Sequence, residues 1–180
     1  MQPIIKEKVR ILRPVEYTQF LQAVPHSKQV LLNGLLLTGM RYVEAVALQA
    51  NPQWIEGTFI KTVSNKAATR FKERWVHLSS TGQLLVPLFA NSADKLPTRQ
   101  TWDENLKRWA VAAGVDPAGI CSKTTRKTWE SWLVFTYPER QTEIGQSQGH
   151  DSLTQARHYL NMPFTAQDKA DMRKYVEGWQ

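Results

Sequence analysis

Two arginines of this 180-residue sequence stand where a guanidinium group could bind a phosphate. Arg41 follows a Thr-Gly pair at the start of a predicted helix. Arg126 shares the face of another predicted helix with Trp129 and Leu133. A guanidinium on an apolar face needs an anion to offset the loss of its hydration. That anion is either a neighbouring carboxylate such as Glu130 or a phosphate, because the planar guanidinium donates two parallel hydrogen bonds to two oxygens.

Each residue that could take part in chemistry also has an ordinary structural interpretation. Arg41 lies three residues before Glu44, which is the spacing of an ion pair on a helix. Lys66 lies in a polar turn, where a lysine is most often a solvated charge. A histidine near a helix start, such as His150, usually donates a local hydrogen bond. A tyrosine near a helix end, such as Tyr159, usually packs its ring on the core with its hydroxyl in water.

Five motifs nevertheless follow one another in a fixed order along most of the chain. The chain reads Thr38-Gly-Met-Arg41-Tyr-Val-Glu44, then Lys66 in a turn, Lys72-Glu-Arg-Trp-Val-His-Leu78, Lys123-Thr-Thr-Arg126, and Gly149-His150 followed nine residues later by Tyr159. The series resembles the catalytic domain of the tyrosine recombinases, the phage-integrase family. That family carries TGxRxxE, a β-hairpin lysine, HxxR, and GH followed nine residues on by a nucleophilic tyrosine. The lysine at position 123 and the C-terminal sequence look similar to integrases of archaeal viruses and plasmids.

The resemblance implies that Arg41 and Arg126 clamp the phosphate that is to be cleaved. Attack on phosphorus adds a second negative charge to the phosphodiester, and two bidentate guanidinium groups stabilise that charge without a metal ion. Lys123 stands where the family has the histidine of HxxR. A lysine is a donor-only cation, so it can hold a phosphate oxygen but cannot act as a base while it is charged.

The resemblance also implies a nucleophile and a general acid. Tyr159 is the implied nucleophile, and its hydroxyl, with an ordinary pKa near 10, needs positioning and nearby cations. Lys66 is our first choice for the acid that protonates the departing 5′-oxygen, and Lys72 is the second, with Lys61 weaker. His150 is expected to donate to the phosphate or to assist proton transfer at the nucleophile.

The implied partner is double-stranded DNA. The chain has 23 Lys and Arg against 16 Asp and Glu, a net charge of +7, which favours a polyanionic partner. Four basic residues are expected to contact the DNA backbone: Lys66, Arg70, Lys72 and Lys127. Together these features predict a site-specific recombinase that integrates or excises a mobile element through a 3′-phosphotyrosyl intermediate.

We expect neither a cofactor nor a metal ion. The single cysteine, Cys121, and four scattered histidines give no cluster at zinc-site spacing, and no glycine-rich phosphate loop is present. Energy kept in the phosphotyrosyl bond lets the strand be rejoined without ATP or a divalent ion.

No apolar run approaches the roughly 18 to 20 residues of a membrane span, and no secretory signal is evident. We therefore expect no membrane contact and a cytoplasmic location in the host cell.

The predicted fold is mainly α-helical with one small antiparallel β-sheet, in a single catalytic domain over residues 1–180. Strands are expected over Thr58–Val63 and Arg74–Leu78. The helix near Met40–Gln49 is expected to bury one face formed by Met40, Val43, Val46 and Ala47. Two tryptophan pairs, Trp102 with Trp109 and Trp129 with Trp132, are assigned to the core. The helices are expected over Pro14–Val24, Ser27–Leu37, Met40–Gln49, Thr101–Ala113, Thr124–Thr136, Pro138–Gln146, Ser152–Leu160 and Thr165–Gly178.

The two ends of the chain carry further expectations. Only 37 residues precede Thr38, so the N-terminal core-binding domain of the family is expected to be absent from this chain. Near the C-terminus, within residues 160–180, three apolar residues form a helical stripe: Met172, Val176 and Trp179. This stripe either packs on its own core or docks on a neighbouring protomer of a tetramer on DNA. The protein alone is expected to be a monomer.

Two other functions remain open at this point. A helical DNA-binding regulator without chemistry, such as a decayed integrase, would use the same basic surface but would have no need for Tyr159. An enzyme like a type IB topoisomerase would share the nucleophile and the phosphate clamp but would relax supercoils without exchanging strands. A metal-dependent nuclease is disfavoured because no carboxylate cluster accompanies the basic residues.

Overall fold

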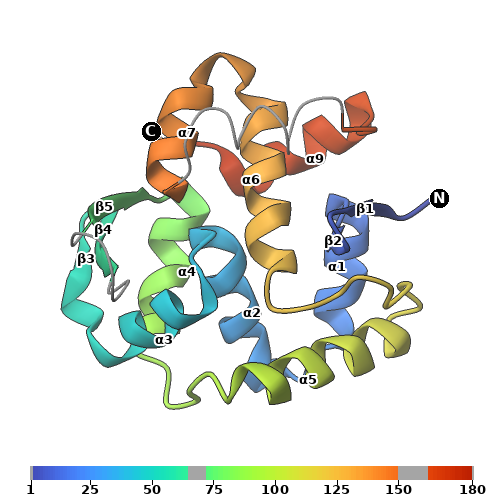
Figure 1. Ribbon diagram of the computed structural model, residues 1–180, viewed down its shortest axis with the longest axis horizontal. Coiled ribbons are helices and arrows are strands. Elements are labelled where there is room, and N and C mark those ends of the chain that lie inside the picture. Colours follow the sequence, from blue (N-terminus) through green and yellow to red (C-terminus); the bar gives the residue numbers. More distant parts are fainter. Residues whose placement is uncertain (1, 65–71, 150–161, 180) are drawn as a thin grey trace.

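Helices make up most of the described part of the chain, which comprises residues 2–64, 72–149 and 162–179 of the computed structural model (Figure 1). The helices are α1 (Pro14–Ala23), α2 (His26–Thr38), α3 (Tyr42–Ala50), α4 (Ser80–Ala90), α5 (Arg99–Ala112), α6 (Thr124–Thr136), α7 (Gln141–Gln148) and α9 (Ala166–Val176), with 3-10 turns η1 (Pro52–Trp54) and η2 (Pro138–Arg140). The helices expected from the sequence in these ranges are present, with ends that differ by a few residues. The helix expected over Ser152–Leu160 lies outside the described residues.

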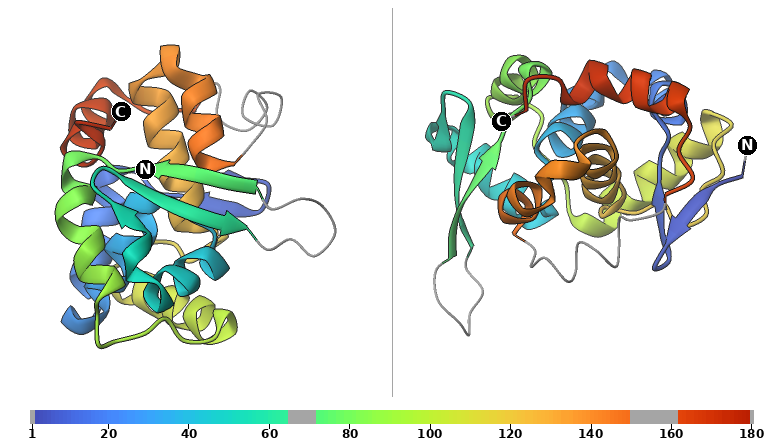
Figure 2. Two further views of the ribbon diagram at one scale, coloured as in Figure 1. Left: turned by 90° about the vertical axis from the view of Figure 1, so that its left-hand side faces the viewer. Right: turned by 90° about the horizontal axis from the view of Figure 1, so that it is seen from above.

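Two small antiparallel sheets lie at opposite ends of the long axis (Figures 1 and 2). One is a hairpin of β1 (Ile4–Lys6) and β2 (Val9–Ile11). The other has the order β3-β4-β5, built from β3 (Ile55–Glu56), β4 (Phe59–Ser64) and β5 (Lys72–His77). Its β4–β5 pair is the hairpin expected from the sequence. The predicted fold class, mainly helical with a small antiparallel sheet, is confirmed.

Helix α6 runs through the middle of the core and packs against α2, α9 and β2. Its Trp129, Trp132 and Leu133 have no exposed surface, as expected for core residues. Two hydrogen bonds tie α6 to the segment between β2 and α1. The indole of Trp132 donates to the carbonyl of Leu12 at 2.9 Å, and the amide of Leu12 donates to the Thr128 hydroxyl at 3.0 Å. The N-terminal end of α6, which carries Arg126, is therefore fixed on a rigid base.

The buried face that we expected for the helix near Met40–Gln49 is correct for Met40, which is buried, but wrong for the two valines. Val43 and Val46 are 69% and 40% exposed. The helix begins at Tyr42 with Arg41 as its N-cap, so Met40 lies in the preceding turn and cannot share a helical face with the two valines. The apolar residues that α3 does bury are Tyr42, Ala45 and Leu48.

A sharp turn separates α2 from α3. Gly39 ends α2 with a left-handed backbone, at a φ of 57°. A Cβ atom there would lie 2.5 Å from both the Gln148 side chain and the Trp129 ring, so the turn requires glycine.

Of the helices described, none is long and apolar enough by itself to span a membrane, and α2 and α3 reach that length only as a pair bent by 115°.

Neither the β1–β2 hairpin nor helix α4 was anticipated from the sequence. The β1–β2 hairpin turns at Glu7 and Lys8, two residues with positive φ rather than the glycine or asparagine that signals such a turn. Helix α4 has Pro87 in its interior and leaves Leu84 and Leu88 74% and 57% exposed. An internal proline and outward-facing leucines hide the helical pattern.

The C-terminal stripe packs on its own chain in this structure. Met172 and Val176 have no exposed surface and Trp179 is 2% exposed, all within the core. The start of α9 is also tied to α1, since the Arg13 guanidinium pairs with the Asp168 carboxylate and donates to the carbonyl of Pro163 at 2.7 Å. Docking of this segment on a neighbouring protomer stays a prediction.

Replacing Gly34 with alanine should destabilise the fold although alanine favours helices. Gly34 lies in α2 against α4, and a Cβ atom would come 2.2 Å from Cγ and 2.5 Å from Cβ of Phe89. These atoms lie next to the backbone of α4 and cannot swing away, so we expect a loss of about 1–3 kcal/mol in unfolding free energy. Urea unfolding measures the effect.

Gly82→Ala is the matched control, because its nearest neighbours would lie 3.4 Å from the new Cβ atom, in ordinary contact. That variant should be unchanged or about 0.5–1 kcal/mol more stable. Equal stability of the two variants would contradict the close packing of α2 on α4.

Candidate active site

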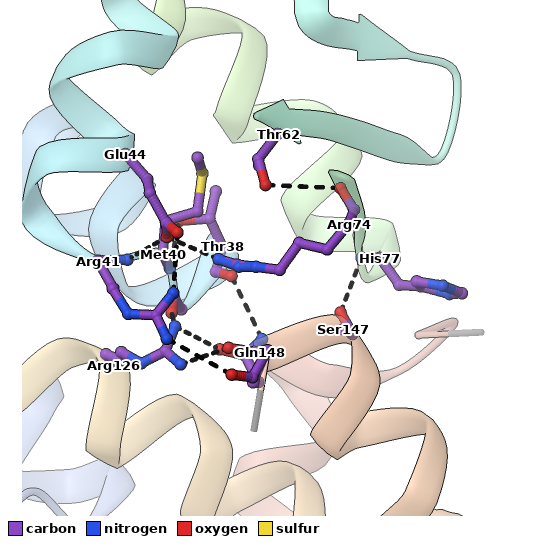
Figure 3. Close-up of polar contacts among 12 residues, drawn as sticks. Thr38, Met40, Arg41, Glu44, Thr62, Arg74, His77, Arg126, Ser147 and Gln148 are labelled. Atoms are coloured by element: carbon purple, nitrogen blue, oxygen red, sulfur yellow. Dashed lines mark hydrogen bonds and ion pairs between the residues drawn. The ribbon is translucent and has the colours of Figure 1, made fainter. Parts of the chain in front are cut away.

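The two predicted arginines meet in one polar network where the α2–α3 turn faces the start of α6 and the end of α7 (Figure 3). Arg126 Nη1 donates to the carbonyl oxygen of Gly39 at 2.7 Å, and its Nη2 donates to the carbonyl of Gln148. Arg41 Nη2 donates to the carbonyl of Gly149 at 3.4 Å. The residue that precedes His150 in the motif thus lies within reach of Arg41.

Several predicted residues are outside the part that the structure describes. These are Lys66, Arg70, His150 and Tyr159, and their roles stay predictions. Lys72 opens strand β5. Lys123 is the N-cap of α6 and is exposed, one turn before Lys127.

Arg41 is the most accessible of the arginines in the network. It is the N-cap of α3, and its side chain is 36% exposed. Its Nη1 lies 2.9 Å from Glu44 Oε1, so the helical ion pair that its spacing suggests is present. Among the described residues, the second terminal nitrogen, Nη2, makes only the long contact with Gly149, so the guanidinium can turn toward an anion from solvent.

Glu44 is a buried carboxylate that joins two arginines. Its Oε2 accepts from the backbone N–H of Arg41 at 2.9 Å and from Nη2 of Arg74 at 2.6 Å. Burial acts to raise the pKa of Glu44, but Arg74, the Arg41 N–H, and the charges of Arg41 and Arg126 outweigh burial and leave that pKa below its usual value. Glu44 is therefore ionised at neutral pH.

Arg126 is buried, with 8% of its surface exposed. The sequence suggested a carboxylate or a phosphate as its partner, and the structure adds backbone carbonyls of two separate segments. The carbonyl oxygens of Gly39 and Gln148 fix the plane of the guanidinium, because one planar group must satisfy acceptors on both sides. The orientation of this arginine is therefore set before any ligand arrives.

Arg74 belongs to the network although sequence analysis did not assign it to the site. It lies on β5, where the amide of His77 donates to the Ser147 hydroxyl at 3.1 Å and keeps the strand beside α7. Burial lowers the pKa of Arg74 to about 10, with Glu44 acting against that shift, so Arg74 stays charged at neutral pH. The signal in the sequence is alternation: Arg74 shares the inward face of the strand with Val76.

Gln148 is a second residue whose role the sequence did not show. Tyrosine recombinases usually have an apolar residue at this position. From the sequence alone, the change to glutamine was expected to have no effect on the site. Its side chain is fully buried and lies between Thr38 and Arg126, accepting from Arg126 Nη1 at 3.5 Å and donating to the carbonyl of Thr38 at 3.5 Å. A polar residue at a helix end carries no periodic signal that would predict such a bridge.

Lys127, expected to contact DNA, forms an ion pair in the structure. Its Nζ lies 2.6 Å from Glu7 Oε2, at the turn of the β1–β2 hairpin. The lysine side chain is 15% exposed and the glutamate 54% exposed, so the pair is open to solvent on one side.

Within residues 2–64, 72–149 and 162–179, no three histidine, cysteine or acidic side chains come close enough to hold a metal ion.

The chemistry available here is the binding of an oxyanion by fixed cations. Three guanidinium groups, from the start of α3, from β5 and from α6, surround the single carboxylate of Glu44. Counted over these four described side chains alone, the net charge is +2, in a partly buried site where charge interactions are stronger than in water. Such a site stabilises a phosphate and the added charge of its transition state.

The chain was compared with protein families, curated proteins and solved structures. No protein-family model and no curated protein sequence matches it. The crystal structure of XerA recombinase matches with a TM-score of 0.65 and 16% sequence identity, over 96% of this chain and 66% of that chain. The XerH site-specific recombinase, bound to palindromic difH substrate in a post-cleavage complex, matches with a TM-score of 0.60 and 19% identity, over 94% and 52% of the two chains.

These matches confirm the predicted fold, which is that of the catalytic domains of tyrosine recombinases. The chain spans about half of the XerH chain and two thirds of the XerA chain. At such low identity the likeness concerns the fold alone.

Replacing Arg126 with lysine should destabilise the protein even though the charge is kept. An ammonium group cannot reach the carbonyl oxygens of Gly39 and Gln148 together, so at least one charged hydrogen bond is lost. We expect a loss of about 1.5–3 kcal/mol in unfolding free energy, measured by urea denaturation.

Arg41→Lys provides the comparison, because Arg41 is more exposed and its ion pair with Glu44 can be kept by lysine. This change should cost less than about 1 kcal/mol. A loss as large as that of Arg126→Lys would show that the two carbonyl bonds do not set the difference.

Proposed function

We propose that this chain is the catalytic domain of a tyrosine recombinase, which cleaves and rejoins DNA strands through a 3′-phosphotyrosyl intermediate without a metal ion. One observation carries the proposal. Arg41 and Arg126, which the motifs TGxRxxE and HxxR designate as the phosphate clamp, share a network with Gly149, the first residue of the GH motif. Arg74, of the Lys72–Leu78 motif, belongs to the same network, so four of the five motifs meet at one place in a fold shared with recombinases.

In the proposed reaction, Arg41 and Arg126 hold the non-bridging oxygens of one phosphodiester, with help from Lys123 and His150. The hydroxyl oxygen of Tyr159 bonds to phosphorus as its proton passes to His150 or to water, and the bond from phosphorus to the 5′-oxygen breaks. Lys66, or alternatively Lys72, protonates that departing oxygen. The reverse sequence, with a 5′-hydroxyl of another strand as nucleophile, releases the tyrosine and joins the strands.

The proposed substrate is double-stranded DNA with an attachment site, acted on by four copies of the chain. XerH was captured on its difH substrate, which supports duplex DNA as the partner of this fold. Lys66, Arg70, Lys72 and Lys127 would follow the phosphate backbone, in keeping with the net charge of +7. We further propose that the element moved belongs to an archaeal virus or plasmid and that the protein acts in the cytoplasm of its host.

A covalent-trapping experiment tests this function. The wild-type chain and Tyr159→Phe are incubated in EDTA with labelled, nicked duplexes of randomised sequence, and protein-linked DNA is separated on a denaturing gel. The nick lets the short 5′-hydroxyl strand diffuse away, so the intermediate accumulates. We expect a covalent complex with the wild type and none with Tyr159→Phe, because phenylalanine has no hydroxyl to bond to phosphorus.

Tyr175→Phe is the matched control. Tyr175 lies on α9 beside Thr18, with its hydroxyl 3.4 Å from the threonine, and it should keep the complex. A complex that persists in Tyr159→Phe contradicts the proposal. DNA binding without any covalent complex favours the non-catalytic regulator, and relaxation of supercoiled DNA without strand exchange favours the topoisomerase-like alternative.

A further inference from the structure

Arg74 has hydrogen-bond donors that no described residue accepts. The residue is 9% exposed, and its Nη2 donates to Glu44 Oε2 at 2.6 Å (Figure 3). Its Nε and Nη1 are buried and have no hydrogen-bond partner among the described residues. Buried donors without a partner are uncommon, so among the described residues the contact with Glu44 is the one that defines what Arg74 does.

The position of Arg74 connects it to the phosphate clamp on two sides. Glu44, to which it donates, also holds Arg41 through the backbone N–H and through Nη1. On the other side, a Cβ atom at Gly149 would lie 3.1 Å from Cδ and 3.2 Å from Nε of Arg74. Arg74 therefore lies between the carboxylate that pairs with the clamp and the glycine of the GH motif.

The charges show what Arg74 contributes. Without it, the buried carboxylate of Glu44 would have Arg41 as its direct ion-pair partner and would cancel the charge of that arginine. With it, Glu44 is shared between two guanidinium groups, and the three arginines keep a net charge of +2. A phosphodiester in its pentacoordinate transition state carries a charge of about −2, so this excess matches the charge to be stabilised.

We propose that Arg74 is a positioning residue for phosphoryl transfer: it takes up the charge of Glu44 and so leaves Arg41 free to bind the scissile phosphate. This inference rests on the proposed function. Arg74 acts through Glu44 and Arg41 and does not itself touch the substrate. A residue that contributed only to stability would not be expected to change how strongly Glu44 binds Arg41.

Charge restoration in a double variant tests the inference. Arg74→Met removes the cation and should slow single-turnover formation of the covalent complex by about tenfold to a hundredfold. Arg74→Met combined with Glu44→Gln removes one positive and one negative charge, returns the site to +2, and should recover most of that loss. Arg108→Met, which removes an exposed hydrogen bond to Asn105 on α5, away from the network, is the control and should leave the rate unchanged.

The pH dependence of DNA binding separates positioning from a merely structural role. The charged groups that face Glu44 are Arg41 of α3, Arg74 of β5 and Arg126 of α6. In Arg74→Met one of these cations is lost, so the pKa of Glu44 rises. Protonation of Glu44 then frees Arg41, and the affinity of Arg74→Met for nicked duplex should increase as pH falls through this raised pKa. The double variant, which has no carboxylate, should lack that increase.

The outcomes keep the two proposals apart. Wild-type protein that forms no covalent complex contradicts the proposed function. The inference is overturned if folded Arg74→Met cleaves as fast as wild type, or if the folded double variant is as slow as Arg74→Met. NMR titration of the Glu44 carboxyl carbon compares the pKa of Glu44 in wild type and in Arg74→Lys. This measurement does not depend on DNA cleavage. If Arg74→Met does not fold, Arg74→Lys replaces it, with its own Glu44→Gln double variant.

Discussion

The buried guanidinium of Arg126 joins three segments that are distant in sequence. It projects from α6 and hydrogen-bonds to the carbonyl that ends α2 and to the carbonyl that ends α7. A planar group with donors on two edges can satisfy both carbonyls only if the two helix ends lie at fixed positions. The left-handed turn at Gly39, which a side chain would block, is what brings the first carbonyl into range.

Around this centre, the site is organised by charge rather than by apolar packing. Glu44 would be costly to bury alone, and it is ionised only because cations approach it from α3, β5 and α6. The same carboxylate keeps three guanidinium groups from repelling one another. Rigid side chains with a small excess of positive charge are suited to binding a phosphate, since little reorganisation is needed when the ligand arrives.

The order of the motifs was the strongest signal in the sequence. Residues that share one chemical task must be of particular types, and this requirement does not depend on the secondary structure around them. The motif order identified Arg41 and Arg126, and the structure brings them together. Apolar periodicity was less reliable where a helix is short or begins off the expected residue, as in α3, and it missed α4, whose interior proline and exposed leucines mask the pattern. Patterns of this kind register burial on one face and say little about which residue caps the helix.

Arg74 and Gln148 could not be assigned from sequence, because their roles depend on tertiary neighbours. Strand alternation is a signal that could have put Arg74 on an inward face, but only the contacts of β5 with α7 and of Arg74 with Glu44 show what this face meets. Gln148 fills a space defined by Thr38 and Arg126, which lie 110 and 22 residues away. Contacts across such separations are properties of the whole fold.

The long-range bonds of Arg126 also bear on how the protein folds. Its bond to Gly39 closes a loop of 87 residues, and the Gln148 bridge to Thr38 closes one of 110. Closing loops of this length costs chain entropy before any contact repays it, so such contacts form late compared with local helices. We therefore expect the helices to be in place first and the arginines to converge in the final steps. A partly folded chain would then be basic enough to attract DNA while still lacking an assembled phosphate clamp.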